Sequence, residues 1–274
     1  MLDLDGFRQY LDEEEMSRNT LNAYMRAVKL YAEKYDEITK GNLIEFKREQ
    51  LLRYKPATVN LRIAALLAYC RFARIPMRLK QVKVQKRSSI DNVISAEQLS
   101  TLLRGLDQDK NRCWIVNILL LAKTGMRISE ALRITKRDVL AGSVTLNTKD
   151  HVRTIYFPES LVDEIRGDLA PLAPTDVVIR GRWQNKKKTL PVTEGGFRIT
   201  LKALAKRYGI PVEVMHPHSF RHFFAIEFLK RKNDIALLAD LLGHSSINMT
   251  QIYLRQSKET QKDAVDGAVD WHML

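Results

Sequence analysis

The chain has 274 residues, enough for one or two domains with a buried core. Lys and Arg number 45 and Asp and Glu 32, so the formal net charge is +13, and 45% of residues are hydrophobic. This composition excludes a disordered chain, and the longest apolar run, 114–122, is far shorter than the roughly 20 residues of a membrane span. With only Cys70 and Cys113, a disulfide framework is excluded and a reducing compartment is expected.

The positive charge is unevenly distributed. Residues 47–87 contain 12 basic residues and a single acidic one, whereas the first 15 residues contain six acids and one base. The acidic start is unlike a secretory or transit peptide. An excess of positive charge favours a polyanionic partner, above all nucleic acid, although plain solubility would also explain it.

The N-terminal part of the chain is predicted to be helical. Apolar residues recur at helical spacing over 17–35, a shorter helix is expected over 43–54, and Pro56 fits the first position of a helix over 56–74. We therefore expect a helical domain over 1–76, with its last helix as the candidate for the DNA major groove.

Pro76 ends this pattern, and residues 77–90 are basic and without periodicity, as in a linker that could also lie on DNA. The candidate DNA contacts are basic side chains in and after the last helix, with a solvated helix face as the plain alternative: Arg62, Arg71, Arg74, Lys80, Lys83, Lys86 and Arg87.

A second domain is expected over 91–274, beginning at the capping-box pattern of Ser95 and Gln98. Its sequence predicts helices over 113–123, 128–134, 195–208 and 234–242. Between them, 144–146 and 152–157 are predicted to form a hairpin, with a possible third strand at 177–179.

Two arginines in this domain are candidates for binding an anion. Arg127 lies just after a glycine turn among apolar neighbours, so it needs a partner, which could be Glu130 or a phosphate. Arg221 lies one helical turn after His218, so that one side chain could bind an anion while the other transfers a proton.

Three further residues have a plain and a chemical interpretation. His244 could be a helix cap or a hydrogen-bond donor, and Tyr253 could be a packed tyrosine or a nucleophile activated by nearby cations. Lys149, at the predicted hairpin turn, could be an inert surface lysine or could protonate a leaving oxygen.

The histidines also raise the possibility of a metal site. His216, His218 and His222 lie within seven residues, and His244 follows. Their spacing is not that of a zinc enzyme, and no cysteine or well-placed carboxylate joins them. We therefore expect no metal.

Taken together, these motifs resemble the tyrosine recombinase (phage integrase) family, in its minimal two-domain form. The resemblance is carried by TGMRISEAL at 124–132, HSFRH at 218–222, LGHSS at 242–246 and the tyrosine nine residues after His244. It covers about 95–262 directly, and residues 1–87 resemble the family's helical core-binding domain more loosely.

The resemblance implies a role for each matching residue. Arg127 and Arg221 would clamp the scissile phosphate, His244 would donate to it, and Tyr253 would attack it to give a 3′-phosphotyrosyl intermediate. Lys149 would protonate the 5′-oxygen, His218 would assist proton transfer, and Glu130 would orient its neighbours. The family's lysine is often flanked by glycine, whereas here Thr148 and Asp150 flank it.

The resemblance also implies a fold and an activity. The fold would be mainly α with a small β-sheet: an N-terminal helical bundle and an α+β catalytic domain. The protein would be a site-specific recombinase acting through a Holliday junction, as integrase, excisionase or resolvase. A type IB topoisomerase-like enzyme and a non-catalytic DNA-binding protein are the alternatives.

The expected surroundings follow from that activity. The partner would be double-stranded DNA with an inverted-repeat site, and four copies would assemble in the synapse, with no cofactor and no membrane. The tail after Tyr253 would join neighbouring copies or cover its own domain, because apolar residues recur in it at helical spacing: Ala264, Val265, Ala268, Val269 and Trp271. The protein would be cytoplasmic and nucleoid-associated.

Overall fold

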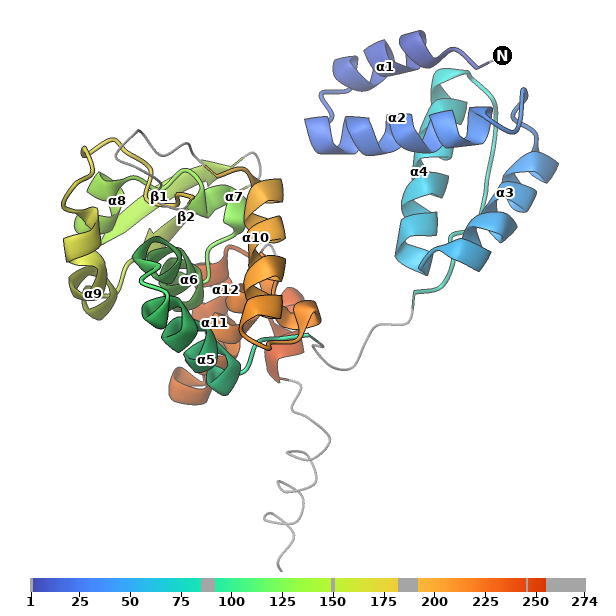
Figure 1. Ribbon diagram of the computed structural model, residues 1–274. Helices are drawn as coiled ribbons and strands as arrows, with labels where there is room; N and C mark the ends of the chain where they lie inside the picture. The colour runs from blue at the N-terminus through green and yellow to red at the C-terminus, as the bar shows by residue number, and fades with distance from the viewer. Residues whose placement is uncertain (1, 85–91, 149–150, 182–191, 245, 255–274) are drawn as a thin grey trace, which may run out of the picture. The chain divides into compact units, whose positions relative to one another are not determined.

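The computed structural model describes residues 2–84, 92–148, 151–181, 192–244 and 246–254. The chain divides into two compact units, Met1–Lys86 and Arg87–Leu274. Both are mainly helical, and the described strands form one two-stranded sheet in the second unit, which confirms the predicted fold class. Figure 1 shows the helices and strands of both units.

Four helices make up the first unit: α1 (Leu4–Glu13), α2 (Arg18–Ala32), α3 (Lys40–Arg53) and α4 (Pro56–Phe72). The side chains of Ser17 and Thr39 cap α2 and α3, and Pro56 takes the first position of α4 as expected. The core is apolar and aromatic, with Phe7 and Tyr31 fully buried.

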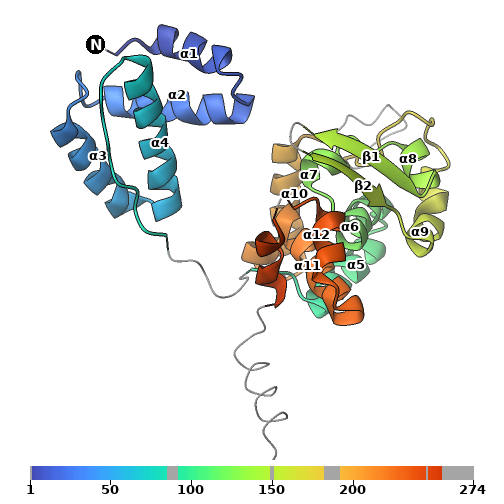
Figure 2. The same cartoon turned by 180° about the vertical axis from the view of Figure 1, so that it is seen from behind.

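The segment after α4 is packed on this unit. The Asn60 side chain donates a hydrogen bond to the Val82 carbonyl at 2.9 Å and accepts one from the Val82 amide at 2.8 Å, so that both backbone groups of Val82 are paired. Met77 and Leu79 contact the core. Residues 77–84 therefore lie along the first unit, beside α4 (Figure 2). Residues 85–90 lie outside the described residues, so the linker over 77–90 stays a prediction.

The second unit is built around α6 (Arg112–Thr124), which is buried along most of its length. Against it pack α5 (Ala96–Gln108), α9 (Glu159–Leu169) and α11 (Pro217–Lys232). The predicted capping box at Ser95 and Gln98 is present and begins α5. The remaining helices, which connect and surround these, are α7 (Ile128–Ala131), α8 (Lys136–Leu140), α10 (Glu194–Arg207), α12 (Ile235–Leu242) and the short 3₁₀ turns η1 (Val212–Val214), η2 (Ile247–Met249) and η3 (Gln251–Leu254).

The predicted hairpin is β1 (Ser143–Thr148) paired antiparallel with β2 (His151–Tyr156), with Leu146 opposite Arg153. The third strand suggested at 177–179 is wrong within the described residues, where Val177 makes one isolated bridge with Thr135. Because Thr135 is the N-cap of α8, the chain turns into helix there and no ladder can extend. The apolar run at 178–179 is instead buried in the core.

No helix in the described part of the chain is both long and apolar enough to cross a membrane.

Candidate active site

Arg127 is presented by a tight turn between two helices. α6 ends at Gly125, which has a left-handed φ of 64°, and a Cβ there would lie 2.4 Å from a ring carbon of Phe224. Arg127 then caps α7, and its Nη2 donates to the Gly243 carbonyl at 3.4 Å. About 37% of its side chain remains exposed, so the guanidinium is held in place but still open to an incoming anion.

Glu130 is the buried carboxylate of the cluster. Its Oε1 accepts from Arg127 Nη1 at 3.1 Å, and its Oε2 accepts from the Arg127 amide at 2.6 Å and from Arg153 Nη2 at 2.8 Å. Glu130 thus joins the turn before α7 to strand β2. This is the arrangement expected of a residue that orients its neighbours.

Arg153 was not singled out from the sequence, yet it is 6% exposed and central to the cluster. Its Nη1 donates to the Leu241 carbonyl at 3.0 Å, so it ties β2 to the end of α12. Burial lowers the pKa of Arg153, and Glu130 opposes that shift. No local pattern marks it, because its partners come from α7 and α12, far away in sequence.

Arg221 is 4% exposed in α11 and is held by backbone carbonyls. Its Nη1 donates to Gly125 O at 2.8 Å and its Nη2 to Leu242 O at 2.6 Å, the C-terminal ends of α6 and α12. Helix C-termini carry partial negative charge and therefore suit a guanidinium. Burial, followed by repulsion from Arg127 and Arg153, lowers its pKa to about 9. It therefore stays cationic at neutral pH.

His244 and Tyr253 complete the group. α12 stops at Gly243 with φ 61°, and the next residue, His244, directs Nδ1 at the buried Thr250 hydroxyl at 2.7 Å. Nε2 is then the nitrogen left to face a substrate. Burial, followed by Arg221 and Arg127, lowers the pKa of His244 to about 4. Its ring lies parallel to that of Tyr253, with centroids 6.5 Å apart.

The Tyr253 hydroxyl lies 2.8 Å from Nδ1 of His222. Burial raises the pKa of Tyr253, while Arg221 and Arg127 pull it down. His222 was counted in the sequence only as a member of the histidine cluster. The available signal was its position four residues after His218, one helical turn further along the same face.

The other two histidines of the cluster have different surroundings. Nδ1 of His216 accepts from the Ser219 amide at 3.1 Å and caps α11. His218, the second residue of α11, is exposed, and burial of its ring together with Arg221 lowers its pKa. Among the described residues, no three His, Cys, Asp or Glu side chains are grouped as a metal site would require.

The remaining predicted residues belong to other parts of the chain. Lys149 lies outside the described residues. Lys86 and Arg87 also lie outside them. In the first unit, Arg71, Arg74, Lys80 and Lys83 are exposed. Arg62 is half-buried: it donates to Gln50 Oε1 and lies over the Tyr54 ring at 3.9 Å.

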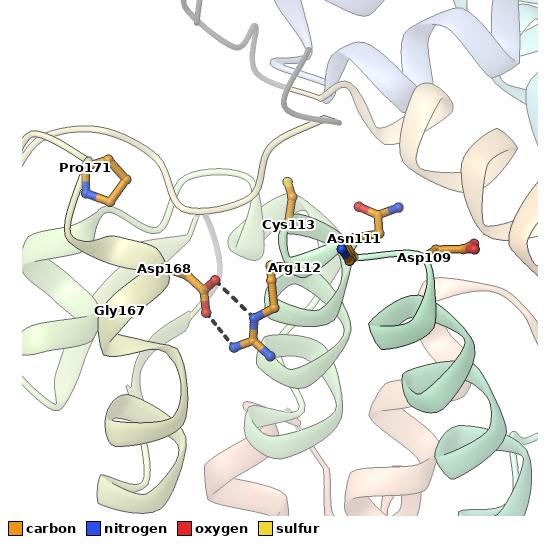
Figure 3. Close-up of a pocket in the computed structure, with 8 residues that line it drawn as sticks. Asp109, Asn111, Arg112, Cys113, Gly167, Asp168 and Pro171 are labelled. Atoms are coloured by element: carbon orange, nitrogen blue, oxygen red, sulfur yellow. Dashed lines mark hydrogen bonds and ion pairs between the residues drawn. The ribbon is translucent and has the colours of Figure 1, made fainter. Parts of the chain in front are cut away.

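Two of the hollows in the second unit differ in their position relative to the cluster. One, of about 420 Å³, borders the cluster between β2 and α12, with Arg153, Gly243 and His244 in its wall. The other, of about 510 Å³, lies between the start of α6 and the end of α9, where Arg112 pairs with Asp168 at 2.7 Å (Figure 3). None of the predicted site residues lines the second hollow, and it is separate from the chemistry.

Comparison with known proteins agrees with the geometry. Residues 92–260 match the model of the phage integrase family, and residues 4–75 match the phage integrase N-terminal SAM-like domain. Tyrosine recombinase XerA of Pyrococcus furiosus is 31% identical over 97% of this chain and 93% of its own. Tyrosine recombinase XerD of Staphylococcus haemolyticus is 25% identical over 90% of each.

Solved structures show the same fold. A crystal structure of XerA recombinase has a TM-score of 0.54 at 22% identity, covering 98% of both chains. A lambda integrase tetramer bound to a Holliday junction has a TM-score of 0.73 at 17% identity, covering 93% of this chain and 77% of that one. With its catalytic-domain match, its N-terminal match and a full-length relative above 30% identity, this chain belongs to the phage integrase family of tyrosine recombinases.

Proposed function

We propose that this protein is a site-specific DNA recombinase that cuts and rejoins DNA through Tyr253. The observation that carries the proposal is that Tyr253 lies beside His222 and His244 of the same chain, within the electrostatic reach of Arg127 and Arg221. A phenol at a cluster of buried cations is the arrangement that nucleophilic attack on a phosphodiester requires.

The chemistry is an exchange of one phosphoester bond for another. Tyr253 Oη attacks phosphorus, the new Oη–P bond forms, and the bond to the 5′-oxygen breaks. The tyrosine loses a proton and the 5′-oxygen gains one, for which Lys149 is the proposed donor. Because a phosphoester is retained throughout, rejoining needs no nucleotide hydrolysis, and the proposal includes no cofactor.

The charge of the cluster suits this reaction. Arg127 and Arg153 pair with one carboxylate, Glu130, and Arg221 adds a third guanidinium that is held by backbone carbonyls. The pKa values of His222 and His244, about 4, leave both rings neutral at neutral pH. The uncompensated positive charge favours a dianionic, phosphorane-like transition state, since guanidinium forks match phosphate oxygens. Arg127 and Arg221 are the proposed clamp, His244 a further donor, and His218 a proton-transfer residue.

The first unit is the proposed source of sequence-independent affinity for duplex DNA. Its candidate contacts, Arg71, Arg74, Lys80 and Lys83, are exposed, and relatives of this fold include XerH bound to its difH substrate. A tetramer on DNA is proposed by analogy with the lambda integrase complex. The inverted-repeat site, a role of residues 255–274 in joining subunits and nucleoid association in the cytoplasm are parts of the same proposal.

Covalent trapping tests the proposal. The substrates are duplexes enriched from a random library by binding to the wild-type chain. Each carries a nick near its centre, and the position of the nick is moved one nucleotide at a time. When cleavage occurs close to the nick, the short cleaved end diffuses away and the covalent complex is trapped. Wild type should become linked to DNA through Tyr253, and Tyr253→Phe should bind the duplex without linkage. Linkage through another tyrosine, or none at any nick position, would overturn the mechanism.

Topoisomerase activity is not favoured, because the relatives that match are recombinases and integrases. The assay that separates the two is relaxation of a supercoiled plasmid that lacks the enriched site. We expect no relaxation on that plasmid and recombination between two copies of the site.

A further inference from the structure

One contact at the proposed site is not explained by the roles given above. Within the described residues, a hydrogen bond of 2.8 Å joins Tyr253 Oη to His222 Nδ1. The two rings are tilted by 52° with centroids 5.5 Å apart, so the contact is between the polar edges and not a stack. A hydrogen bond to the atom that attacks phosphorus bears directly on where its proton goes.

The fold positions His222 for this contact. It lies in the middle of α11, on the turn that also carries Arg221, whose guanidinium is fixed by the carbonyls of Gly125 and Leu242. Tyr253 packs against a small apolar cluster contributed by α11 and α12, whose buried members are Ala225, Leu229, Leu238 and Leu242. The packing of α11 against η3 therefore brings the two partners of the hydrogen bond together, which is the preorganisation that proton transfer needs.

His222 is also in the protonation state that an acceptor needs. Burial, followed by the neighbouring His218 and His216, lowers its pKa to about 4, so the ring is neutral at neutral pH. A neutral imidazole has one ring nitrogen that accepts a hydrogen bond. The phosphodiester, once bound between Arg127 and Arg221, brings negative charge that raises the basicity of the ring.

His218 is less well placed for the same task. It lies one turn earlier, at the start of α11, and it is exposed to solvent. The charged side chains that lower its pKa are led by Arg221 and Arg198. The described hydrogen bond to the Tyr253 hydroxyl is made by His222. The family resemblance gave His218 the proton-transfer role, and the geometry favours its neighbour one turn on.

We infer that His222 is a catalytic residue of this recombinase, which orients the Tyr253 hydroxyl and accepts its proton as the tyrosine attacks. The inference rests on the proposed function and extends it. As the Oη–P bond forms, the Oη–H proton passes to His222 Nδ1. The bond from phosphorus to the 5′-oxygen breaks, and that oxygen takes a proton from a separate acid. On rejoining, the 5′-hydroxyl attacks and returns its proton to the conjugate base of that acid, while the imidazolium of His222 returns its proton to the departing tyrosine.

The test measures single-turnover formation of the phosphotyrosyl bond on the nicked duplex found for wild type. His222→Ala removes both the contact and the base, whereas His222→Gln keeps a side chain that can accept a hydrogen bond but cannot take up a proton. Both variants should be slower by a factor of about 10²–10⁴, as for loss of a general base, with duplex affinity within a few fold of wild type. The matched control is His216→Asn, because asparagine also caps a helix well; its rate should stay near that of wild type.

A second substrate separates the two ends of the reaction. In a duplex with sulfur in place of the bridging 5′-oxygen, the leaving thiolate needs no proton, so a variant that lacks the acid recovers. The His222 variants should stay slow on this substrate, because the tyrosine must still lose its proton.

Two results would overturn the inference. One is a rate for His222→Gln within about threefold of wild type, which would make the residue a hydrogen-bonding support only. The other is recovery of both variants on the sulfur substrate, which would place His222 on the leaving-group side. If His222→Ala fails to fold, His222→Gln decides. If wild type itself forms no covalent complex, the proposed function fails, and this outcome is distinct from a failure of the His222 variants alone.

Discussion

The two units differ in whether their charged side chains are buried or exposed. In the first unit the only buried polar side chain among the described residues is Gln50, and the predicted DNA-contacting arginines are half-buried or exposed. In the second, Glu130, Arg153 and Arg221 are all at most 6% exposed. Burial of a charge costs free energy unless the charge is paired and hydrogen-bonded. The second unit therefore carries a desolvation cost that the first unit does not have.

That difference indicates two ways of binding an anion. Exposed arginines and lysines attract a phosphate backbone at long range, with strong dependence on salt. Buried guanidiniums, fixed by Glu130 and by the carbonyls of Gly125, Leu241 and Leu242, can hold one phosphate at a defined position. The following experiments test whether burial is what separates the two, from the largest expected effect to the smallest.

Removing the shared carboxylate should have the largest effect on stability. Glu130→Gln leaves Arg153 buried beside Arg127 without its counter-charge, and breaking one side of a buried ion pair costs about 3–5 kcal/mol. The loss of unfolding free energy is measured by urea unfolding followed by tryptophan fluorescence. This signal reports the second unit, because all three tryptophans lie after residue 90.

The matched control is Glu164→Gln, which breaks the exposed pair with Lys123. Surface pairs contribute roughly 0–1 kcal/mol, so this variant should unfold close to wild type. Equal losses in the two variants would mean that burial does not distinguish them.

The end of α12 should be the next most sensitive point. At Gly243, a Cβ would lie 2.5 Å from Arg153 Cδ, and φ is 61°. We expect Gly243→Ala to cost about 1–3 kcal/mol of unfolding free energy, since strained backbone and a displaced buried side chain add together. It should also slow phosphotyrosyl formation, because Arg153 and His244 move.

Gly142→Ala is the control for backbone strain alone. Gly142 has φ 76°, and nothing lies within 4 Å of a Cβ built there. A loss as large as that of Gly243→Ala would show that contact with Arg153 is unimportant.

Acid should weaken the second unit selectively. The pKa values of His222 and His244 are lowered to about 4, whereas an unfolded chain protonates histidine near 6.5. The unfolded state therefore binds more protons as pH falls, and stability present above pH 6.5 is progressively lost down to about pH 4. The first unit contains no histidine.

Hydrogen exchange at pH 7 and pH 5 distinguishes the units. Amides of α6 and α11 should exchange faster at the lower pH, after correction for the intrinsic rate, than those of α2 and α4. His222→Gln should reduce the difference. Equal changes in the two units would contradict a histidine origin.

The smallest effects are expected in the first unit. Arg71→Ala removes an exposed charge and should lower the salt dependence of duplex binding by about one counterion, with little change in stability.

Arg62→Ala removes a contact with Gln50 and a cation–π contact with Tyr54, so it should cost about 0.5–1 kcal/mol of stability. Salt dependence is measured by fluorescence anisotropy of labelled duplex, and stability by urea unfolding followed by helical circular dichroism, because the first unit contains no tryptophan. A larger loss of stability in Arg71→Ala than in Arg62→Ala would contradict this assignment.

Local signals predicted most of the elements. The capping box at Ser95, Pro56 at the start of α4, the hairpin on either side of 149–150 and the stop of α12 at Gly243 all occur as expected. Each depends on residues within a few positions of one another. The strand suggested at 177–179 failed because Thr135, its bridge partner among the described residues, begins a helix, which the sequence of 177–179 does not reveal.

The candidate site was predictable to the extent that its residues lie in motifs. Arg127, Glu130, Arg221, His244 and Tyr253 were found by spacing, and they lie together in the structure. Arg153 was not singled out, and His222 was counted only as a member of the histidine cluster, since the contacts of both are made with residues far away in sequence. Their partners are 88 and 31 residues away, respectively, at Leu241 and Tyr253.

The sequence by itself determined the family, the helical character of both units and the set of residue types that could act on a phosphate. The tertiary structure decided which of those residues are buried, which guanidiniums share Glu130, and which histidine contacts the tyrosine. The physical reason is that helix and turn formation depend on neighbours along the chain. Burial and the hydrogen bonds within the cluster depend instead on segments that only packing around α6 brings together.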